Sequence, residues 1–366
     1  MNNELLYLIS LTQVNHIGSV HAKALISIYG NAENIFKAPR HHLEKIEGIG
    51  TIRANSIKSY NDFDLCEKEI AFLEKNRITP LSMKDADYPQ RLLNCYDNPV
   101  LLYFKGNTDL NERRTVSIVG TRNNSEYGRS ICEEFIEHLK EEDVLIVSGL
   151  AFGIDTITHK TAVKHDISTV GVLAHGLDRI YPHQNRNLAK HMLDKGGLLT
   201  EFISGSDPDR ENFPKRNRIV AGLADAVIVI ESGKKGGSII TAEIANGYNR
   251  DVFAFPGRIT DAKSEGCNSL IRNNKAVLLT DAEHFLGMMN WKAVSKPAVR
   301  QRELFISLTP DEQIIVNILK QQSSIHIDEL YLKSKLSAST AASALLMLEM
   351  NNVIISLPGK IYQLNN

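Results

Sequence analysis

The chain has 366 residues, of which 43% are hydrophobic and 23% are charged, and this composition predicts a globular protein of two or three domains rather than a disordered chain. Its 42 basic and 43 acidic residues leave a net charge of −1, which excludes a bulk attraction to polyanions and requires any nucleic-acid site to be a local basic patch. Four widely separated cysteines argue against a disulfide framework or a paired-cysteine zinc site and favour a reducing compartment. No signal peptide and no apolar run of about 18 residues is visible, so we expect a cytoplasmic protein with no membrane partner.

The first segment, residues 1–78, has the pattern of short helices separated by glycine turns. The stretch LEKIEGIGTIRANSI at 43–57 is typical of a helix-hairpin-helix motif, and a weaker copy covers 14–25. Such a turn can present backbone N–H groups to a phosphate without reading base sequence. The basic residues that flank the turn are few: Lys45, Arg53 and Lys58. Contact with DNA and simple packing of the two hairpins therefore remain alternatives.

The second segment, residues 79–290, alternates short apolar runs with helical patterns. We predict strands at 115–119, 144–148, 168–173, 226–230, 251–255 and 276–279. Near-continuous apolar strands that alternate with helices indicate a parallel sheet covered on both faces. With right-handed crossovers, the fold class is α/β, an extended Rossmann-like domain with a doubly wound parallel sheet.

The loop after the first predicted strand carries a candidate anion receptor. Gly120 permits a tight turn and Ser125 is a candidate cap for the next helix. The dinucleotide fingerprint GxGxxG is missing. Arg122 instead follows the carboxyl end of the strand, where open α/β sheets bind ligands.

The next two loops contain histidines at positions that could suit a ligand. Asp155 and His159 are four residues apart on one predicted helix face. A metal site would need a third ligand, so we expect a structural hydrogen bond between this pair instead. His175 and His183 lie in a glycine loop, where they could bind a ligand, bond to the backbone or face solvent.

A basic cluster precedes the predicted strand at 226–230. Residues 215–218 read Lys-Arg-Asn-Arg and adjoin an apolar helix. Arginine forks match phosphate oxygens, and Asn217 adds amide donors. Gly237 and Ser238 then open another helix, whose free N–H groups suit a phosphate. We expect Arg122 and the cluster to meet at one edge of the sheet and form a single phosphate pocket.

The last part of the chain comprises a linker at 291–305 and a winged-helix domain at 306–366. Three helical patterns precede strand, turn and strand, with the turn at Pro358-Gly359. Ser337 or Ser339 is a candidate cap for the third helix. That helix lacks Arg and Lys, which disfavours base reading and favours a structural or partner-binding role.

Taken together, these loops resemble the DNA-processing protein A family. The resembling stretches follow the family order over about residues 85–285 and read VGTRNNSEYG, SGLAFGIDTITHK, HGLDRIYP, NFPKRNRIVAGLADAVIVIES, GSIITAEIA, and FAFPGR followed by SEGCNSLI. Two positions depart from the family pattern, since His175 stands where glycine is usual and Gly236 where serine is usual.

The resemblance implies a protein that binds single-stranded DNA and brings a RecA-type recombinase onto it during DNA uptake, natural transformation and recombination. It also implies a homodimer formed through the Rossmann-like domain, with a single-strand-binding protein as a further candidate partner. The candidate DNA- or phosphate-binding residues are Gly120, Arg122, Lys160, Lys215, Arg216, Asn217, Arg218, Gly237 and Ser238. We expect no catalytic residue, no metal and no cofactor.

An enzymatic alternative remains open. The central segment also resembles the lysine-decarboxylase-like nucleotide phosphoribohydrolases, because Gly236-Gly237-Ser238 to Glu243 echoes part of their glycine loop. In that interpretation Glu243 assists departure of the base and Arg218 holds the phosphate. The carboxylates Glu201, Glu231 and Glu243 also have structural interpretations, as helix caps or as salt-bridge partners.

Overall fold

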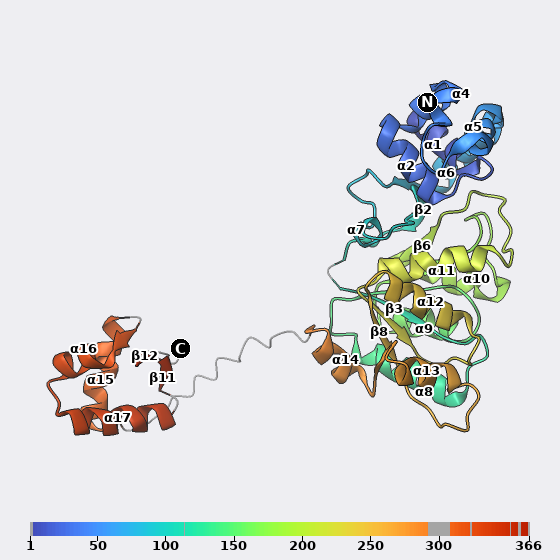
Figure 1. Ribbon diagram of the computed structural model, residues 1–366. Helices are drawn as coiled ribbons and strands as arrows, with labels where there is room; N and C mark the ends of the chain where they lie inside the picture. The colour runs from blue at the N-terminus through green and yellow to red at the C-terminus, as the bar shows by residue number, and fades with distance from the viewer. Residues whose placement is uncertain are drawn as a thin grey trace. The chain divides into compact units, whose positions relative to one another are not determined.

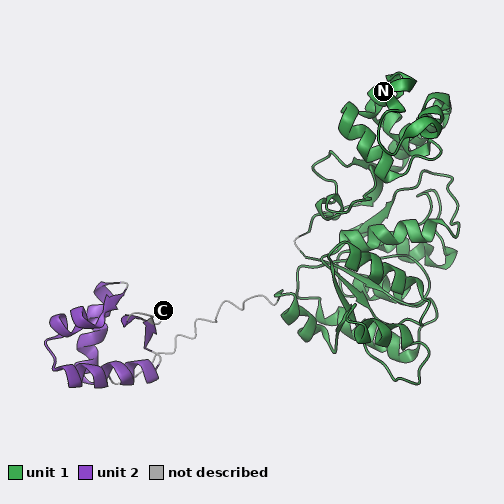
Figure 2. Cartoon of the chain, viewed as in Figure 1, with its two compact units in different colours: residues 1–293 green, residues 294–366 purple. Residues whose placement is uncertain are grey.

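The computed structural model divides the chain into two compact units, residues 1–293 and 294–366 (Figure 2). The residues that it describes are 3–112, 114–291, 308–322, 324–351, 353–357 and 360–364. The predicted linker therefore lies outside the described residues except for Trp291. Among the helices described, none is both long and apolar enough to cross a membrane.

Six helices form the N-terminal part of the first unit (Figure 1): α1 Asn3–Gln13, α2 Ser19–Tyr29, α3 Ala32–Lys37, α4 Arg40–Leu43, α5 Gly50–Ser59 and α6 Phe63–Asn76. They enclose a core that includes Ile9, Leu25 and Leu43. The pairs α1–α2 and α4–α5 coincide with the two predicted hairpins. Gly48 and Gly50 have φ values of +80° and +58°, a region that disfavours residues with a Cβ, so the turn between α4 and α5 depends on glycine.

Two of the three basic residues beside this turn are engaged inside the helical domain. Arg53 donates to the carbonyls of Gly48 at 2.9 Å and His16 at 3.1 Å, which ties the two hairpins together. Lys58 donates to the carbonyls of Phe36 and Ala38. These contacts favour the packing interpretation of the hairpins.

A nine-stranded sheet forms the rest of the first unit, in the order β1-β2-β6-β5-β4-β3-β7-β8-β9. The strands are β1 Thr79–Ser82, β2 Leu101–Gly106, β3 Thr115–Val119, β4 Leu145–Ser148, β5 Thr169–Val172, β6 Gly197–Thr200, β7 Ala226–Val229, β8 Asp251–Ala254 and β9 Val277–Leu278. Strands β3 to β9 pair in parallel, and β1 and β2 extend the sheet antiparallel beyond β6. The doubly wound parallel sheet is thus confirmed.

Helices cover both faces of this sheet (Figure 1). They are α7 Gln90–Leu93, α8 Glu126–His138, α9 Ile154–Lys164, α10 Arg186–Lys195, α11 Asn212–Leu223, α12 Gly237–Gly247, α13 Glu265–Arg272 and α14 Ala282–Met288. Buried residues of α11 and α12 share one core with Val147 and Val227, while those of α8, α9 and α14 share the opposite core with Val116 and Ile146. Ser125 caps α8 by accepting a hydrogen bond from the Gly128 N–H, as predicted.

The second unit has the elements of a winged helix, which confirms the prediction. It contains α15 Pro310–Gln321, β10 Ile325–His326, α16 Ile327–Ser334, α17 Ala338–Met350, β11 Ile354–Leu357 and β12 Ile361–Leu364. Its three strands pair in the order β10-β12-β11. Ser337 caps α17 by accepting from the Thr340 N–H. The predicted turn at Pro358-Gly359 lies outside the described residues.

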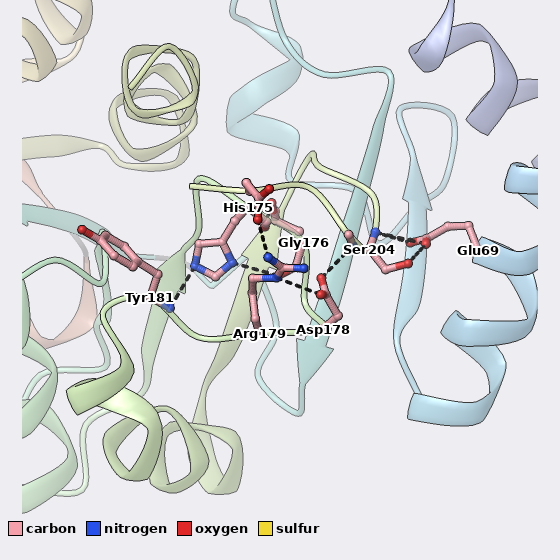
Figure 3. A network of polar contacts seen from close by, with 10 residues as sticks. Glu69, His175, Gly176, Asp178, Arg179, Tyr181 and Ser204 are labelled. Atoms are coloured by element: carbon pink, nitrogen blue, oxygen red, sulfur yellow. Dashed lines mark hydrogen bonds and ion pairs between the residues drawn. The ribbon is translucent and has the colours of Figure 1, made fainter. Parts of the chain in front are cut away.

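A buried carboxylate joins the N-terminal helices to the central sheet domain (Figure 3). Glu69 on α6 accepts hydrogen bonds from the Ser204 N–H at 3.0 and 3.1 Å and from the Ser204 hydroxyl. The same loop is held by Asp178, which accepts from the Gly205 N–H at 2.9 Å and pairs with Arg179. Burial raises the pKa of Glu69 above its ordinary value, and the bonds from Ser204 oppose that rise.

This burial predicts how the stability of the protein depends on pH. Because the folded pKa of Glu69 is raised, the folded state binds this proton more readily than the unfolded state. The contribution of the Glu69 carboxyl to stability therefore declines as the pH rises from the ordinary pKa of 4.5 to the raised pKa of the folded state, and it is constant at higher pH. Urea unfolding of wild type and Glu69→Gln at several pH values measures the effect.

We expect the free energy of unfolding of wild type minus that of Glu69→Gln to fall with rising pH over that interval. Glu67→Gln, an exposed position on the same helix, controls for loss of one negative charge. A difference that rises with pH would contradict the prediction.

Candidate functional site

The carboxyl ends of β3, β4 and β7 meet the starts of α11 and α12 around a cavity of about 710 Å³. We call it the sheet-edge cavity. Six of the predicted site residues line this cavity: Gly120, Arg122, Arg216, Asn217, Gly237 and Ser238. The topology thus brings together residues that lie more than a hundred positions apart, at the edge where open α/β sheets bind ligands.

The glycines of this edge are required by the protein's own packing. A Cβ on Gly120 would lie 2.4 Å from the side chain of Ile154 at the start of α9. A Cβ on Gly149 would lie 2.3 Å from Asp155 Oδ2 and 2.4 Å from Arg216 Nη1. The sequence indicated that Gly120 permits a tight turn; the structure shows in addition that the space beside Gly120 and Gly149 is filled by other side chains of the chain.

Asp155 and Arg216 are buried opposite charges that face each other across Gly149. Arg216 donates to the Val172 carbonyl at 2.6 Å and to Asn217 Oδ1 at 3.1 Å. Asp155 accepts from the Ala151 N–H at 3.2 Å. Burial raises the pKa of Asp155, and the positive charge of Arg216 opposes that rise. The pair fixes the guanidinium of Arg216 in the floor of the cavity, where the nearby carboxyl of Asp155 opposes its charge.

The prediction of a hydrogen bond between Asp155 and His159 is wrong, because both ring nitrogens of His159 have other partners. Its Nε2 lies 2.6 Å from the Gly149 carbonyl, and its Nδ1 lies 2.7 Å from Thr169 Oγ1. Burial lowers the pKa of His159 to about 4. His159 is therefore a neutral structural residue that ties α9 to β5.

Arg122 is an exposed cation of the cavity that lies beside an aromatic ring. Its guanidinium carbon lies 4.8 Å from the centroid of the Phe213 ring, and Arg216 approaches the same ring at 6.0 Å. Arg210 and Lys235 also line the cavity and are exposed. Sequence reasoning did not select Phe213, Arg210 or Lys235. The only signal was their proximity in sequence to the basic cluster and to the Gly236-Gly237 turn.

The start of α12 faces the same cavity. Gly236 precedes the helix and provides no side-chain cap. The Ile239 N–H donates to the Gly236 carbonyl at 3.1 Å, which leaves the N–H groups of Gly237 and Ser238 for a ligand. Ser238 donates its hydroxyl to Ser232 Oγ at 2.8 Å. A helix start with uncapped N–H groups is a favourable position for a phosphate.

The basic cluster is divided between two cavities. Lys215 and Arg218 line a second cavity of about 880 Å³, between the N-terminal helices and the sheet domain. We call it the domain cleft. Residues 216 and 218 are roughly 200° apart around helix α11, so their side chains point to opposite sides. Arg218 pairs with Glu201 and donates to the Asp97 carbonyl. The single pocket expected for the whole cluster is thus not formed.

The remaining candidates lie outside the sheet-edge cavity. Lys160 is exposed on α9 and is not part of the lining of either cavity. His175 is buried and bonded to the backbone, with the Gly176 carbonyl 2.8 Å from its Nδ1 and the Tyr181 N–H donating to its Nε2. Burial lowers the pKa of His175, so it braces the loop in its neutral form.

The candidate carboxylates all have structural partners. Glu201 pairs with Arg218, Glu231 accepts from the N–H and hydroxyl of Ser125, and Glu243 pairs with Lys275 at 2.8 Å. Within the described ranges, no group of three or more His, Cys, Asp or Glu side chains is arranged to hold a metal ion.

Comparison with known proteins covers nearly the whole chain. Residues 79–290 match the family model described as DNA recombination-mediator protein A, residues 302–360 the DprA winged helix domain and residues 8–65 the helix-hairpin-helix motif. The chain is 36% identical over 288 residues to Protein Smf of Synechocystis sp., covering 76% of this chain and 71% of that protein. It is 42% identical over 213 residues to DNA processing protein DprA of Streptococcus pneumoniae, and the match covers 58% of this chain and 75% of that protein.

Two solved structures are similar over the described fold. The X-ray structure of DNA processing protein A from Streptococcus pneumoniae has a TM-score of 0.64 and 33% identity, and the match covers 78% of this chain and 98% of that chain. A structure of DNA processing protein A from Helicobacter pylori, described as giving insight into its single-stranded DNA binding mode, has a TM-score of 0.54 and 28% identity, covering 58% and 96%.

The buried charges of the cavity floor predict a specific pattern of stability. Arg216→Leu would leave Asp155 buried without its opposite charge, so we expect a loss of about 3–5 kcal/mol in the free energy of unfolding. Asp155→Asn in the Arg216→Leu background should restore part of that loss, since the uncompensated charge is removed. Arg122→Ala, at an exposed position, should stay within about 0.5 kcal/mol of wild type.

Denaturant unfolding of the four proteins measures these differences. Equal losses in Arg216→Leu with and without Asp155→Asn would show that the two charges do not interact.

Proposed function

Because the chain belongs to the DNA recombination-mediator protein A family, we propose that it binds single-stranded DNA at the sheet-edge cavity and processes that DNA for recombination. One observation supports this proposal above the others. A floor built from glycine turns and a buried arginine is surrounded by exposed cations, although the chain as a whole is not basic. A local positive site of this kind attracts a polyanion without a bulk charge.

Each part of the cavity supplies a different contact. The exposed guanidinium of Arg122 binds a phosphate, and the uncapped start of α12 binds a second through backbone N–H groups. The ring of Phe213 lies beside Arg122 and offers a surface on which a base can stack without sequence preference. Arg210 and Lys235 extend the positive rim. Binding by these means needs a flexible strand, so single strands are favoured over duplex.

The domain cleft has the opposite electrostatic character. Four acidic side chains line it (Asp97, Glu201, Asp207 and Asp209), against two basic ones, so phosphates are disfavoured there. Lys215 is exposed and follows Pro214, which lines both cavities. We propose that Lys215 contacts the single-stranded DNA at the point where the DNA leaves the sheet-edge cavity. Arg218 contributes less, because Glu201 already compensates its charge.

The finer role rests on the family. We propose that the bound strand is delivered to a RecA-type recombinase during DNA uptake and natural transformation, in the cytoplasm. The chain would act as a homodimer through the sheet domain and exchange DNA with a single-strand-binding protein. The match to a recombination-mediator family supports this role.

Salt titration tests the proposed contact. Arg122→Ala should weaken binding to an unstructured single-stranded oligonucleotide by about 1.5–3 kcal/mol, the value of a charge-assisted hydrogen bond. The slope of log affinity against log salt should become shallower by about 0.7, the value for one phosphate contact on a single strand. Lys235→Ala should change the slope in the same direction.

The matched control is Arg272→Ala, an exposed arginine at the end of α13 that lines neither cavity. Circular dichroism checks that each variant is folded. Unchanged slope and affinity in a folded Arg122→Ala protein would refute the proposed site.

We also propose that the protein acts by binding rather than by catalysis. A phosphoribohydrolase would need Glu243 and Arg218 in one site, yet Glu243 is half-exposed and paired with Lys275, and Arg218 is paired with Glu201. Incubation with nucleoside monophosphates should therefore release no free base, as measured by chromatography. Sustained base release that disappears in Glu243→Gln would overturn this proposal.

A further inference from the structure

Helix α17 of the winged-helix unit exposes an apolar face. Its inner face is buried, including Leu345 and Leu348. Its outer face exposes 57% of Leu346, 49% of Met347 and 71% of Met350. In a winged helix this element is the one expected to enter a DNA groove, yet the sequence from 336 to 359 contains no Arg or Lys. An exposed apolar stripe of this kind marks an interaction with a protein surface rather than with phosphates.

The side chains of the exposed stripe increase in size along the helix. Its first half carries small side chains and its second half carries large ones, in the order Ser339, Ala342, Ser343, Leu346, Met347 and Met350. At about 100° per residue, these six positions fall on one face of the helix, and the exposed Glu349 borders that face beside Ala342. The midpoint of the stripe lies between residues 344 and 345.

This change in size makes the stripe complementary to a second copy of itself. If two copies of α17 pack antiparallel about a two-fold axis at the midpoint, residues at the same lateral position meet. Ala342 then faces the partner's Leu346, Ser343 faces the partner's Met347, and Ser339 faces the partner's Met350. Every contact joins one small and one large side chain, which is the arrangement that fills space without overlap.

We propose that the outer face of α17 binds the outer face of α17 in a second copy of this chain, antiparallel and about a two-fold axis. A parallel pair would set large residues against large and small against small, which leaves both overlap and voids. The stripe consists of only six side chains, so the contact is small and would be strengthened by any other contact between the same two chains.

Site-specific crosslinking of the full chain locates the contact. All four native cysteines are buried, so an introduced cysteine is the reactive one. One population carries Ser339→Cys and the other Met350→Cys, and they are mixed with a bismaleimide that spans about 10 Å or less. We expect crosslinks in the mixture but in neither population alone, because identical positions in an antiparallel pair lie about 16 Å apart along the helices.

A second experiment tests size complementarity with an exchange of residues. In the same crosslinking mixture, Ala342→Leu should lower the yield at least fivefold because two large side chains then meet, and Leu346→Ala should lower it by leaving a void. The double variant Ala342→Leu with Leu346→Ala has the same composition as wild type and should restore most of the yield. Alanine and leucine are both strong helix formers, so α17 remains helical in every variant.

The matched control is Ser339→Cys mixed with Gln321→Cys, where Gln321 is exposed at the end of α15. This pair measures random encounter between the two units and should give little product. Crosslinks within a single population would indicate parallel packing and overturn the proposal. Yields no higher than the control, or no recovery in the double variant, would also overturn it.

Discussion

The candidate site depends on the pair of opposite charges buried at the carboxyl edge of the sheet. Asp155 lies in the first turn of α9 and Arg216 lies in α11, on opposite faces of the sheet, and the two side chains approach each other beside Gly149, which leaves room for both. Removing two charges from water is costly, and their attraction together with bonds to Val172 and Asn217 offsets that cost. The guanidinium of Arg216 is thereby held at a fixed point, and the strand ends and the start of α12 are arranged around it.

Sequence periodicity predicted the strands and the alternation of helices because these depend on local apolar runs. The strand β6, at Gly197–Thr200, was missed because a four-residue strand that begins with glycine carries no such signal. The antiparallel strands β1 and β2 belong to the sheet through pairing that no local pattern encodes. The bond between Glu69 and Ser204 was equally invisible, since the two residues are 135 positions apart.

The sequence predicted where the candidate site lies, but not that the basic cluster is divided between two cavities. A basic cluster in four successive residues looks like one patch, yet a helix distributes successive residues around its circumference. Arg216 is therefore buried in the sheet-edge cavity, while Arg218 points into the acidic domain cleft. Phe213 and Arg210 could not be singled out, because only the fold shows that they line the cavity.

The contact geometry at Gly149 constrains how the sequence can change over evolutionary time. A side chain at this position would displace the ends of both Asp155 and Arg216, so a larger residue there requires those two side chains to move or to be replaced by smaller ones in the same lineage. The first and last of the three positions are more than sixty residues apart in the sequence, yet a substitution at one of them affects the packing of the other two. An aligned set of sequences should therefore show them changing together or not at all, and a homologue that replaces only one of them would be expected to carry a rebuilt sheet edge.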